Sequence, residues 1–142
     1  MAVDNMVKDC LFCDIAAGYQ AAHTVLDEDA ILAFLDFRPL FPGHVLVIPR
    51  PHHVTLLDLP VTSLGPLFGA VQRVAAAVTH SMGADGTFVA MNNGVSQSVP
   101  HLHVHVVPRR TKDGLRGFFW PRTRYGSEAE ASGIASRIRA SF

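Results

Sequence analysis

Three histidines at alternate positions are the part of this sequence best suited to chemistry. Residues 101–107 read His-Leu-His-Val-His-Val-Val. Side chains alternate between the faces of a β-strand, so a strand here places His101, His103 and His105 on one face and apolar side chains on the other. The apolar side predicts a buried sheet surface, and the row of imidazoles predicts a functional site.

Two kinds of chemistry fit this row. Same-face positions lie about 6.6 Å apart, too far for three rings to share one zinc ion at Zn–N distances of about 2.1 Å. Neighbouring pairs would bind a metal only with ligands from elsewhere. Alternatively, a neutral imidazole is a nucleophile when a backbone carbonyl holds one ring nitrogen as N–H and leaves the other its lone pair. Neighbouring imidazoles would then donate to an anionic group, as phosphoryl chemistry requires.

A Cys-x-x-Cys pair near the N-terminus is a second candidate site. Cys10 and Cys13 are the only two cysteines of the chain. A closed zinc site needs four ligands, so histidines would have to complete it. A thioredoxin-like redox role lacks the preceding strand that such a motif follows. Ordinary buried thiols are the remaining alternative.

Composition limits the classes of protein that this chain can represent. The chain has 142 residues, of which 49% are hydrophobic and 17% charged, and its basic and acidic residues both number 12. These values predict one domain over residues 1–142, with a mobile arm at 1–9 and a basic, aromatic extension at 109–142. Zero net charge gives no support for binding to nucleic acid or to a membrane surface. No secretory signal or bilayer-spanning run is expected, so we predict a cytoplasmic protein.

The hydrophobic pattern predicts an α+β fold, an antiparallel β-sheet of about five strands with one long helix. Ser63 is expected to cap the long helix and Gly83 to end it, with Pro66 in its first turn. A capping box at Ser127 predicts a weak terminal helix, which Gly133 destabilises. The other expected elements are a short helix at 10–18 and strands at 23–26, 31–36, 44–48, 87–91 and 102–107.

On these residues the sequence resembles the histidine triad (HIT) family of nucleotide hydrolases and transferases. Residues 101–107 match the family signature, in which histidines alternate with apolar residues, at every position. Residues 34–49 resemble its nucleotide-binding strand pair, and residues 92–99 resemble its phosphate loop. The likeness covers about residues 10 to 108 and implies the family's fold and a homodimer.

The resemblance assigns catalytic roles. It implies that His103 attacks the α-phosphorus and becomes a nucleotidyl-histidine. His105 and His44 would hold the phosphate oxygens, together with Ser98. Gln97 would lie near the leaving group.

The resemblance also implies a nucleotide-binding set. Asp36 would accept hydrogen bonds from the two ribose hydroxyls, although an aspartate at a strand end also serves as a turn cap. The pocket for the base and sugar would be lined by Phe34, Leu35 and Phe37. Asn93 would belong to the phosphate loop.

For the cysteine pair, the resemblance implies a structural zinc site completed by His52 and His101, with the adjacent His53 as a possible substitute. Such a closed site ties the N-terminal segment to the sheet and does not activate water.

The implied function is a hydrolase or nucleotidyl transferase that cleaves the α-phosphate bond of a nucleoside 5′-phosphate derivative and releases a nucleoside monophosphate, purine nucleotides being the expected ligands. Dinucleoside polyphosphates, phosphoramidates and nucleotidyl sulfates are candidate substrates. Ser96, where the family usually has glycine, and Pro100 depart from the pattern beside the leaving group. Two alternatives are a metal-dependent hydrolase that uses the histidine strand as ligands and a non-catalytic nucleotide-binding or interaction protein.

The extension after Pro108 is basic and contains the aromatic run Phe118-Phe119-Trp120-Pro121. The basic residues either form a solvated loop or attract a polyphosphate leaving group. The aromatic run is expected in the core, over the substrate pocket or in a dimer interface.

Overall fold

A computed structural model describes residues 6–116 and 122–142. The chain forms, in order, α1 (Leu11–Ala17), β1 (Thr24–Asp27), β2 (Ile31–Leu35), β3 (Val45–Pro49), a 3₁₀ turn η1 (Leu56–Asp58), α2 (Val61–Met82), β4 (Gly86–Ala90), β5 (Val104–Arg109) and α3 (Glu128–Arg139).

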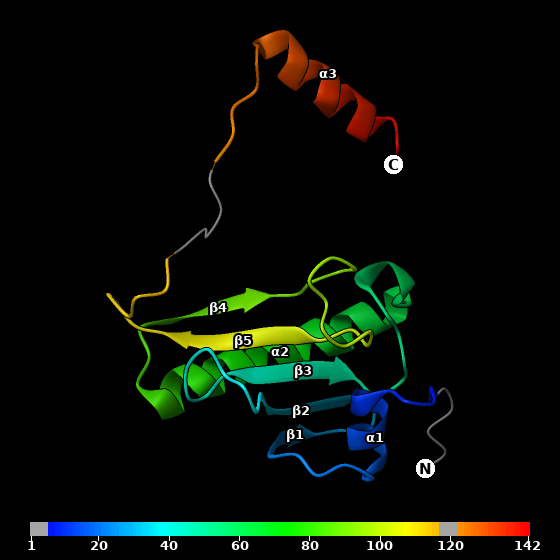
Figure 1. The fold of residues 1–142 in the computed structure, drawn as a ribbon, viewed down its shortest axis with the longest axis vertical. Coiled ribbons are helices and arrows are strands. Elements are labelled where there is room, and N and C mark those ends of the chain that lie inside the picture. The colour runs from blue at the N-terminus through cyan, green and yellow to red at the C-terminus, as the bar shows by residue number, and fades with distance from the viewer. Residues whose placement is uncertain (1–5, 117–121) are drawn as a thin grey trace.

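The strands form one five-stranded sheet in the order β1-β2-β3-β5-β4 (Figure 1). Every neighbouring pair is antiparallel. This architecture confirms the predicted α+β fold with one long helix. The central strands β3 and β5 are buried along most of their length, so side chains that they carry are held by sheet hydrogen bonds on both sides.

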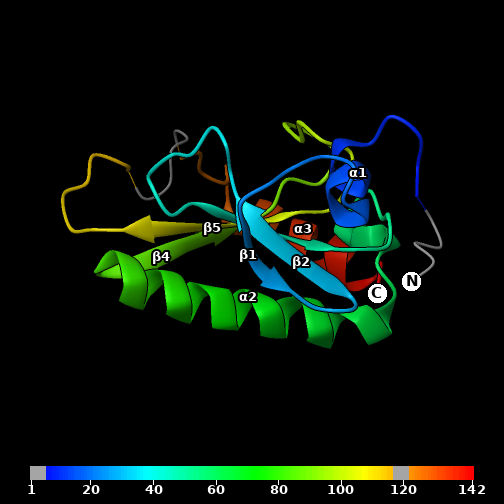
Figure 2. The same ribbon diagram turned by 90° about the horizontal axis from the view of Figure 1, so that it is seen from below.

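Two apolar cores lie on opposite faces of the sheet. Helix α2 covers one face, and the short helix α1 packs on the other (Figure 2). Alternation within the strands divides the cores: Val45 and Val47 of β3 face α2, whereas Leu46 and Ile48 face α1. The α1 face is therefore available for the histidines, whose positions alternate with those of the α2-facing residues on β5.

Helix α2 differs from the prediction in two respects. It begins at Val61 after Pro60, whose carbonyl accepts the Ser63 N–H at 2.9 Å, so Ser63 lies inside the helix and Pro66 lies beyond its first turn. By length and composition it is also the one helix in the described residues that could cross a membrane. Arg73 is its only Lys, Arg, Asp or Glu residue, and it interrupts the apolar run of the helix. Here the helix packs on the sheet, and Arg73 pairs with Glu28 at 2.6 Å.

The C-terminal helix α3 lies apart from the sheet (Figure 1) and has no buried residue. It begins as predicted at Ser127, whose hydroxyl accepts the Glu130 N–H at 3.1 Å. The aromatic run at 118–121 lies outside the described residues, so its three expected placements stay predictions.

Gly43 holds the turn that leads into His44. Its φ of +95° is a conformation that favours glycine, and an added Cβ would lie 2.8 Å from Cγ of Met82. We expect Gly43→Ala to lower the free energy of unfolding by about 2 kcal/mol through strain and overpacking, measured by urea titration. Gly65→Ala is the matched control, because an alanine there meets nothing within 4 Å and should stabilise helix α2 by about 0.5–1 kcal/mol. Equal effects of the two substitutions would contradict this account.

Candidate functional site

The predicted histidines gather on the α1 side of the sheet. His105 lies on β5 opposite Leu46 of β3, while His101 and His103 lie just before β5. The strand was predicted from residue 102, but Leu102 instead donates its N–H to the His53 carbonyl at 2.6 Å. The histidine side chains nevertheless still share one face, and the ring centroids of His103 and His105 are 5.0 Å apart. His44, which precedes β3, completes the group and is 3% exposed.

The tautomer of His103 is set by the backbone. Its Nδ1 lies 2.7 Å from the carbonyl oxygen of His101, so Nδ1 carries the hydrogen and donates it. The lone pair is then on Nε2. In the described part of the chain no hydrogen bond of Nε2 is found, and no buried nitrogen is left without a partner, so Nε2 is open to the adjoining pocket. His103 thus presents a neutral nucleophilic nitrogen.

A chain of hydrogen bonds from Leu40 through His44 fixes the tautomers of His44 and His105. The Leu40 N–H donates to Nδ1 of His44 at 3.1 Å, which leaves the hydrogen of neutral His44 on Nε2. Nε2 of His44 lies 2.9 Å from Nδ1 of His105, so His44 donates and His105 accepts. The hydrogen of His105 is therefore on Nε2. This ring can donate to an anion beside His103.

Burial keeps these imidazoles neutral. It lowers the pKa of His44 and of His103, in each case as the largest cause. For His105, burial together with the neighbouring imidazoles of His103 and His44 lowers the pKa to about 4. Neutral rings are what the hydrogen-bond directions above require, and they keep the His103 lone pair unprotonated at neutral pH.

The low pKa of His105 predicts an acid-dependent stability. The pKa of His105 is about 6.5 in the unfolded chain and about 4 in the folded protein. Between these two pH values the unfolded state binds a proton that the native state does not. The free energy of unfolding must therefore fall as the pH drops through this window. We expect this fall to be roughly 1 kcal/mol smaller in His105→Gln at about pH 5, measured by urea titration against neutral pH. His80→Gln, at an exposed position, is the control and should keep the wild-type slope; an unchanged slope in His105→Gln would contradict the assignment.

Two neighbouring pockets adjoin the histidines. The first has a volume of about 350 Å³ and contains His103 and His105, the carboxylate of Asp36 and the hydroxyl of Ser98. Asp36 Oδ1 accepts the Arg38 N–H at 2.8 Å, as a turn cap does, and Oδ2 lies 3.6 Å from Nε2 of His44. The pocket thus combines a nucleophile, hydrogen-bond donors and one carboxylate.

The second pocket is largely apolar, with a volume of about 400 Å³. It contains the predicted Phe34, Leu35 and Phe37, and Phe37 and Leu11 line both pockets. Sequence analysis missed its remaining walls, which come from α1 and the segment after it: Leu11, Ile15, Gln20, Ala21, Ala22 and His23. His23 is exposed and lines this pocket.

Two predicted residues lie outside these pockets. The Gln97 amide donates to the Val54 carbonyl at 2.6 Å and accepts the Gly94 N–H at 2.9 Å. The Asn93 side chain accepts the Leu56 N–H at 2.7 Å. Both side chains are used to hold the loop, so their expected substrate contacts stay predictions.

The basic residues after Pro108 begin away from the histidines. Arg109 ends β5, about 13 Å along the strand from His105. Its guanidinium pairs with Asp113 at 2.6 Å, and Arg110 donates to the Met82 carbonyl. These two side chains support a turn. This favours a structural role for this part of the segment over attraction of a polyphosphate leaving group.

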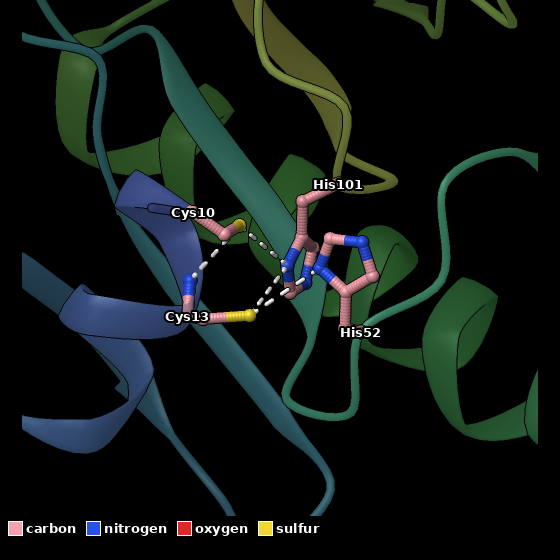
Figure 3. A group of neighbouring side chains, drawn as sticks. All are labelled: Cys10, Cys13, His52 and His101. Carbon is pink, nitrogen blue, oxygen red and sulfur yellow. Dashed lines mark hydrogen bonds between the residues drawn. The ribbon is translucent and has the colours of Figure 1, made fainter. Parts of the chain in front are cut away.

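Cys10, Cys13, His52 and His101 form a compact group (Figure 3). Their ligand atoms all lie within 4.8 Å of one another. Nδ1 of His101 is 3.6 Å from both sulfur atoms, and Nδ1 of His52 is 3.3 Å from Cys13 Sγ. Ligands of a tetrahedral zinc ion are separated by about 3.5 Å, so the spacing fits. His53 is not part of the group.

The surroundings of this group also fit a metal. Nε2 of His101 donates to the Pro49 carbonyl at 2.8 Å, which fixes the hydrogen there and turns the lone pair of Nδ1 toward the cysteines. Burial raises the pKa of the Cys13 thiol, so a thiolate here needs a cation beside it. A Cys₂His₂ set of this kind suits zinc.

Asp36, His44 and His105 also lie within 4.8 Å of one another. The His44 and His105 rings are 5.1 Å apart between centroids, and their bonded nitrogens are 2.9 Å apart. Those two nitrogens therefore point at each other and not at a common third point. A metal would require both rings to turn, which argues against the metal-dependent alternative.

Together the fold and the site define a class of α+β protein in which neutral histidines at a central antiparallel strand face an open pocket. A family model described as "HIT domain" matches residues 18–112. The chain belongs to the HIT family.

Relatives and solved structures agree with this assignment. A HIT-like protein of Mycobacterium tuberculosis is 38% identical over 87% of this chain and 88% of its own length. An adenylylsulfatase of Arabidopsis thaliana is 33% identical over 78% of this chain and 57% of its own length. A bis(5′-nucleosyl)-tetraphosphatase of Schizosaccharomyces pombe is 39% identical over 57% of this chain and 46% of its own length.

Among solved structures, a HIT family protein from Bacillus subtilis superposes with a TM-score of 0.87 at 30% identity, covering 95% of this chain and 98% of that one. A zinc-bound histidine triad protein from Mycobacterium smegmatis superposes with a TM-score of 0.72 at 34% identity, covering 94% of this chain and 98% of that one.

Proposed function

We propose that this protein cleaves the α-phosphate bond of a nucleoside 5′-phosphate derivative through a nucleotidyl-histidine on His103. The observation that carries the proposal is the hydrogen bond from His103 Nδ1 to the His101 carbonyl, which leaves Nε2 as a free nucleophile in a pocket. A protein that only bound nucleotides would not need this nitrogen.

The reaction proceeds in two steps. Nε2 of His103 donates its lone pair to the α-phosphorus, and the bond from that phosphorus to the leaving group breaks, with its electron pair leaving on the departing atom. Water, or another acceptor in a transferase, then attacks the phosphorus and loses a proton to the solvent. The P–N bond breaks with its electron pair returning to Nε2, which restores the neutral imidazole and releases the nucleotide. The Nε2–H of His105 and the hydroxyl of Ser98 stabilise the charge on the phosphoryl oxygens in both steps, and His44 supports them by donating its Nε2–H to Nδ1 of His105.

The neighbouring apolar pocket supports a nucleoside as the other half of the substrate. Aromatic and aliphatic walls suit a purine base, and Asp36, in the adjoining histidine pocket, has an oxygen able to accept from ribose hydroxyls. The names of the Arabidopsis and fission-yeast relatives favour an adenylyl sulfate and a dinucleoside tetraphosphate among the candidates.

Product analysis in ¹⁸O-labelled water tests this function. Adenosine 5′-phosphosulfate, diadenosine tetraphosphate and an adenosine phosphoramidate are incubated with the purified protein. We expect AMP from at least one of them, with the label in the AMP phosphate because water attacks the α-phosphorus. Label found only in the leaving group, or no turnover of any of them, would refute the proposal.

Zinc is proposed as a structural ion held by Cys10, Cys13, His52 and His101. When bound there it would tie α1 to the sheet without an open position for water. The catalytic steps above use none of its coordination positions.

We also propose that the protein acts as a cytoplasmic homodimer. Strand β4 is an edge of the sheet, and its Val89 is 42% exposed. An uncovered edge favours pairing with another chain, and a second copy is the partner that the family resemblance implies. Sedimentation measurements on the purified protein test the dimer.

A further inference from the structure

The Cys₂His₂ group lies directly against the proposed nucleophile. Phe12, between the two cysteines on α1, is 2% exposed. Its ring meets His103 edge-on, with centroids 5.0 Å apart and planes at 87°, and meets His101 at 6.0 Å and 71°. The segment that supplies both sulfur atoms therefore also packs the reactive ring.

His101 links the two sites through its main chain. Its ring is committed at both nitrogens, since Nδ1 faces the cysteines and Nε2 donates to Pro49. Its carbonyl accepts the Nδ1–H of His103 at 2.7 Å. Anchoring the ring of His101 therefore fixes the position of the acceptor on which the His103 tautomer depends.

The loop that follows His52 extends this connection. The His53 carbonyl accepts the Leu102 N–H at 2.6 Å, at the start of the histidine segment. The Val54 carbonyl accepts from Gln97 at 2.6 Å, in the loop that carries Ser98. Residues near the metal group thus hold the nucleophile from one side and the phosphate loop from another.

We propose that the Cys10–Cys13–His52–His101 group is a positioning device for His103, acting through the His101 carbonyl and the ring of Phe12. When the contacts within this group are lost, α1 and the His101 carbonyl are no longer held in place. The Nδ1–H of His103 then loses its single hydrogen-bond partner. Both tautomers are then populated, and the tautomer with hydrogen on Nε2 cannot attack phosphorus. Phe12 is accordingly a positioning residue. The catalytic consequence rests on the proposed function, but the geometry of the ring does not.

The test compares Phe12→Leu with Ile48→Val, a control in the same α1-side core that lines none of the pockets described above. The ¹⁵N shifts of the histidine rings report the tautomer of His103 at neutral pH, and elemental analysis reports zinc. In wild-type protein loaded with zinc we expect one His103 tautomer, with hydrogen on Nδ1. In Phe12→Leu with zinc retained, and in chelated wild-type protein, we expect a mixture. Ile48→Val should match wild type.

Turnover supplies a second measurement. We expect kcat of Phe12→Leu to fall about tenfold through loss of alignment, with a much smaller change in KM. Wild-type ¹⁵N shifts in chelated protein or in zinc-loaded Phe12→Leu would overturn the proposal. The shifts are recorded without substrate, so a failure of the proposed function appears as absent turnover with the tautomer shifts intact, and the two failures are distinguishable.

Discussion

Replacing His103 with alanine is expected to lower kcat by about 10³-fold or more on any substrate that the wild-type protein turns over. The substitution removes the atom that forms the P–N bond, and no other ring in the site has both a free nucleophilic nitrogen and access to the pocket. His105 cannot substitute, because its Nδ1 is occupied by His44 and its Nε2 carries a hydrogen. Steady-state release of AMP measures the effect.

Two controls separate chemistry from folding and metal. His103→Ala should retain the wild-type zinc content and unfolding midpoint within a few degrees, and His80→Ala should retain full activity. Rapid quenching at alkaline pH followed by mass spectrometry should find a nucleotide on His103 in the wild-type protein. Substantial turnover by His103→Ala would eliminate the covalent mechanism and revive the metal-dependent alternative.

Removing the metal is expected to give the largest loss of stability. A ligand that binds only the native state at about 1,000 times its Kd stabilises that state by about 4 kcal/mol. For a chain of this size that energy corresponds to a shift in Tm of roughly 10 °C or more. Thermal unfolding of zinc-loaded and chelated protein measures the shift directly, and Cys13→Ser should reproduce the chelated value.

Adjacent histidines provide a matched pair for this prediction. His52 faces the cysteines, whereas His53 lies outside the group. We expect His52→Ala to lose bound zinc and the associated stability, and His53→Ala to keep both, by elemental analysis and thermal unfolding. Zinc lost equally from the two variants would show that ligand assignment by geometry is wrong.

Much of the fold could be predicted because its signals are local. The apolar run of β3, the alternation in β5 and the helical period of α2 identify these elements. The start of α2 could not be placed, because the helix begins at Val61 after Pro60, which has no capping side chain, and not after the predicted cap Ser63. The start of β5 also depends on a partner outside the strand, the His53 carbonyl that takes the Leu102 N–H.

The candidate site could be predicted where residue spacing carries it. The alternate histidines identify the sheet face that carries the candidate site, and the family resemblance identifies the residues that the structure brings next to Cys10. The roles of Leu11, Phe12 and His23 could not be found, because those side chains reach the site only after α1 docks on the sheet. The hydrogen-bond relay from Leu40 to His105 is equally non-local.

The side chains of α1 and its N-cap point in two directions. Cys10, Phe12 and Cys13 face the metal group and the histidines, while Leu11 and Ile15 border the apolar pocket. Ile15 lines only the apolar pocket, whereas Leu11 also lines the histidine pocket, so a library that randomises Ile15 is expected to change which ligands the apolar pocket accepts and to leave the side chains around His103 in place. One short helix therefore contains separate positions for changing selectivity, at Ile15, and reactivity, at Phe12.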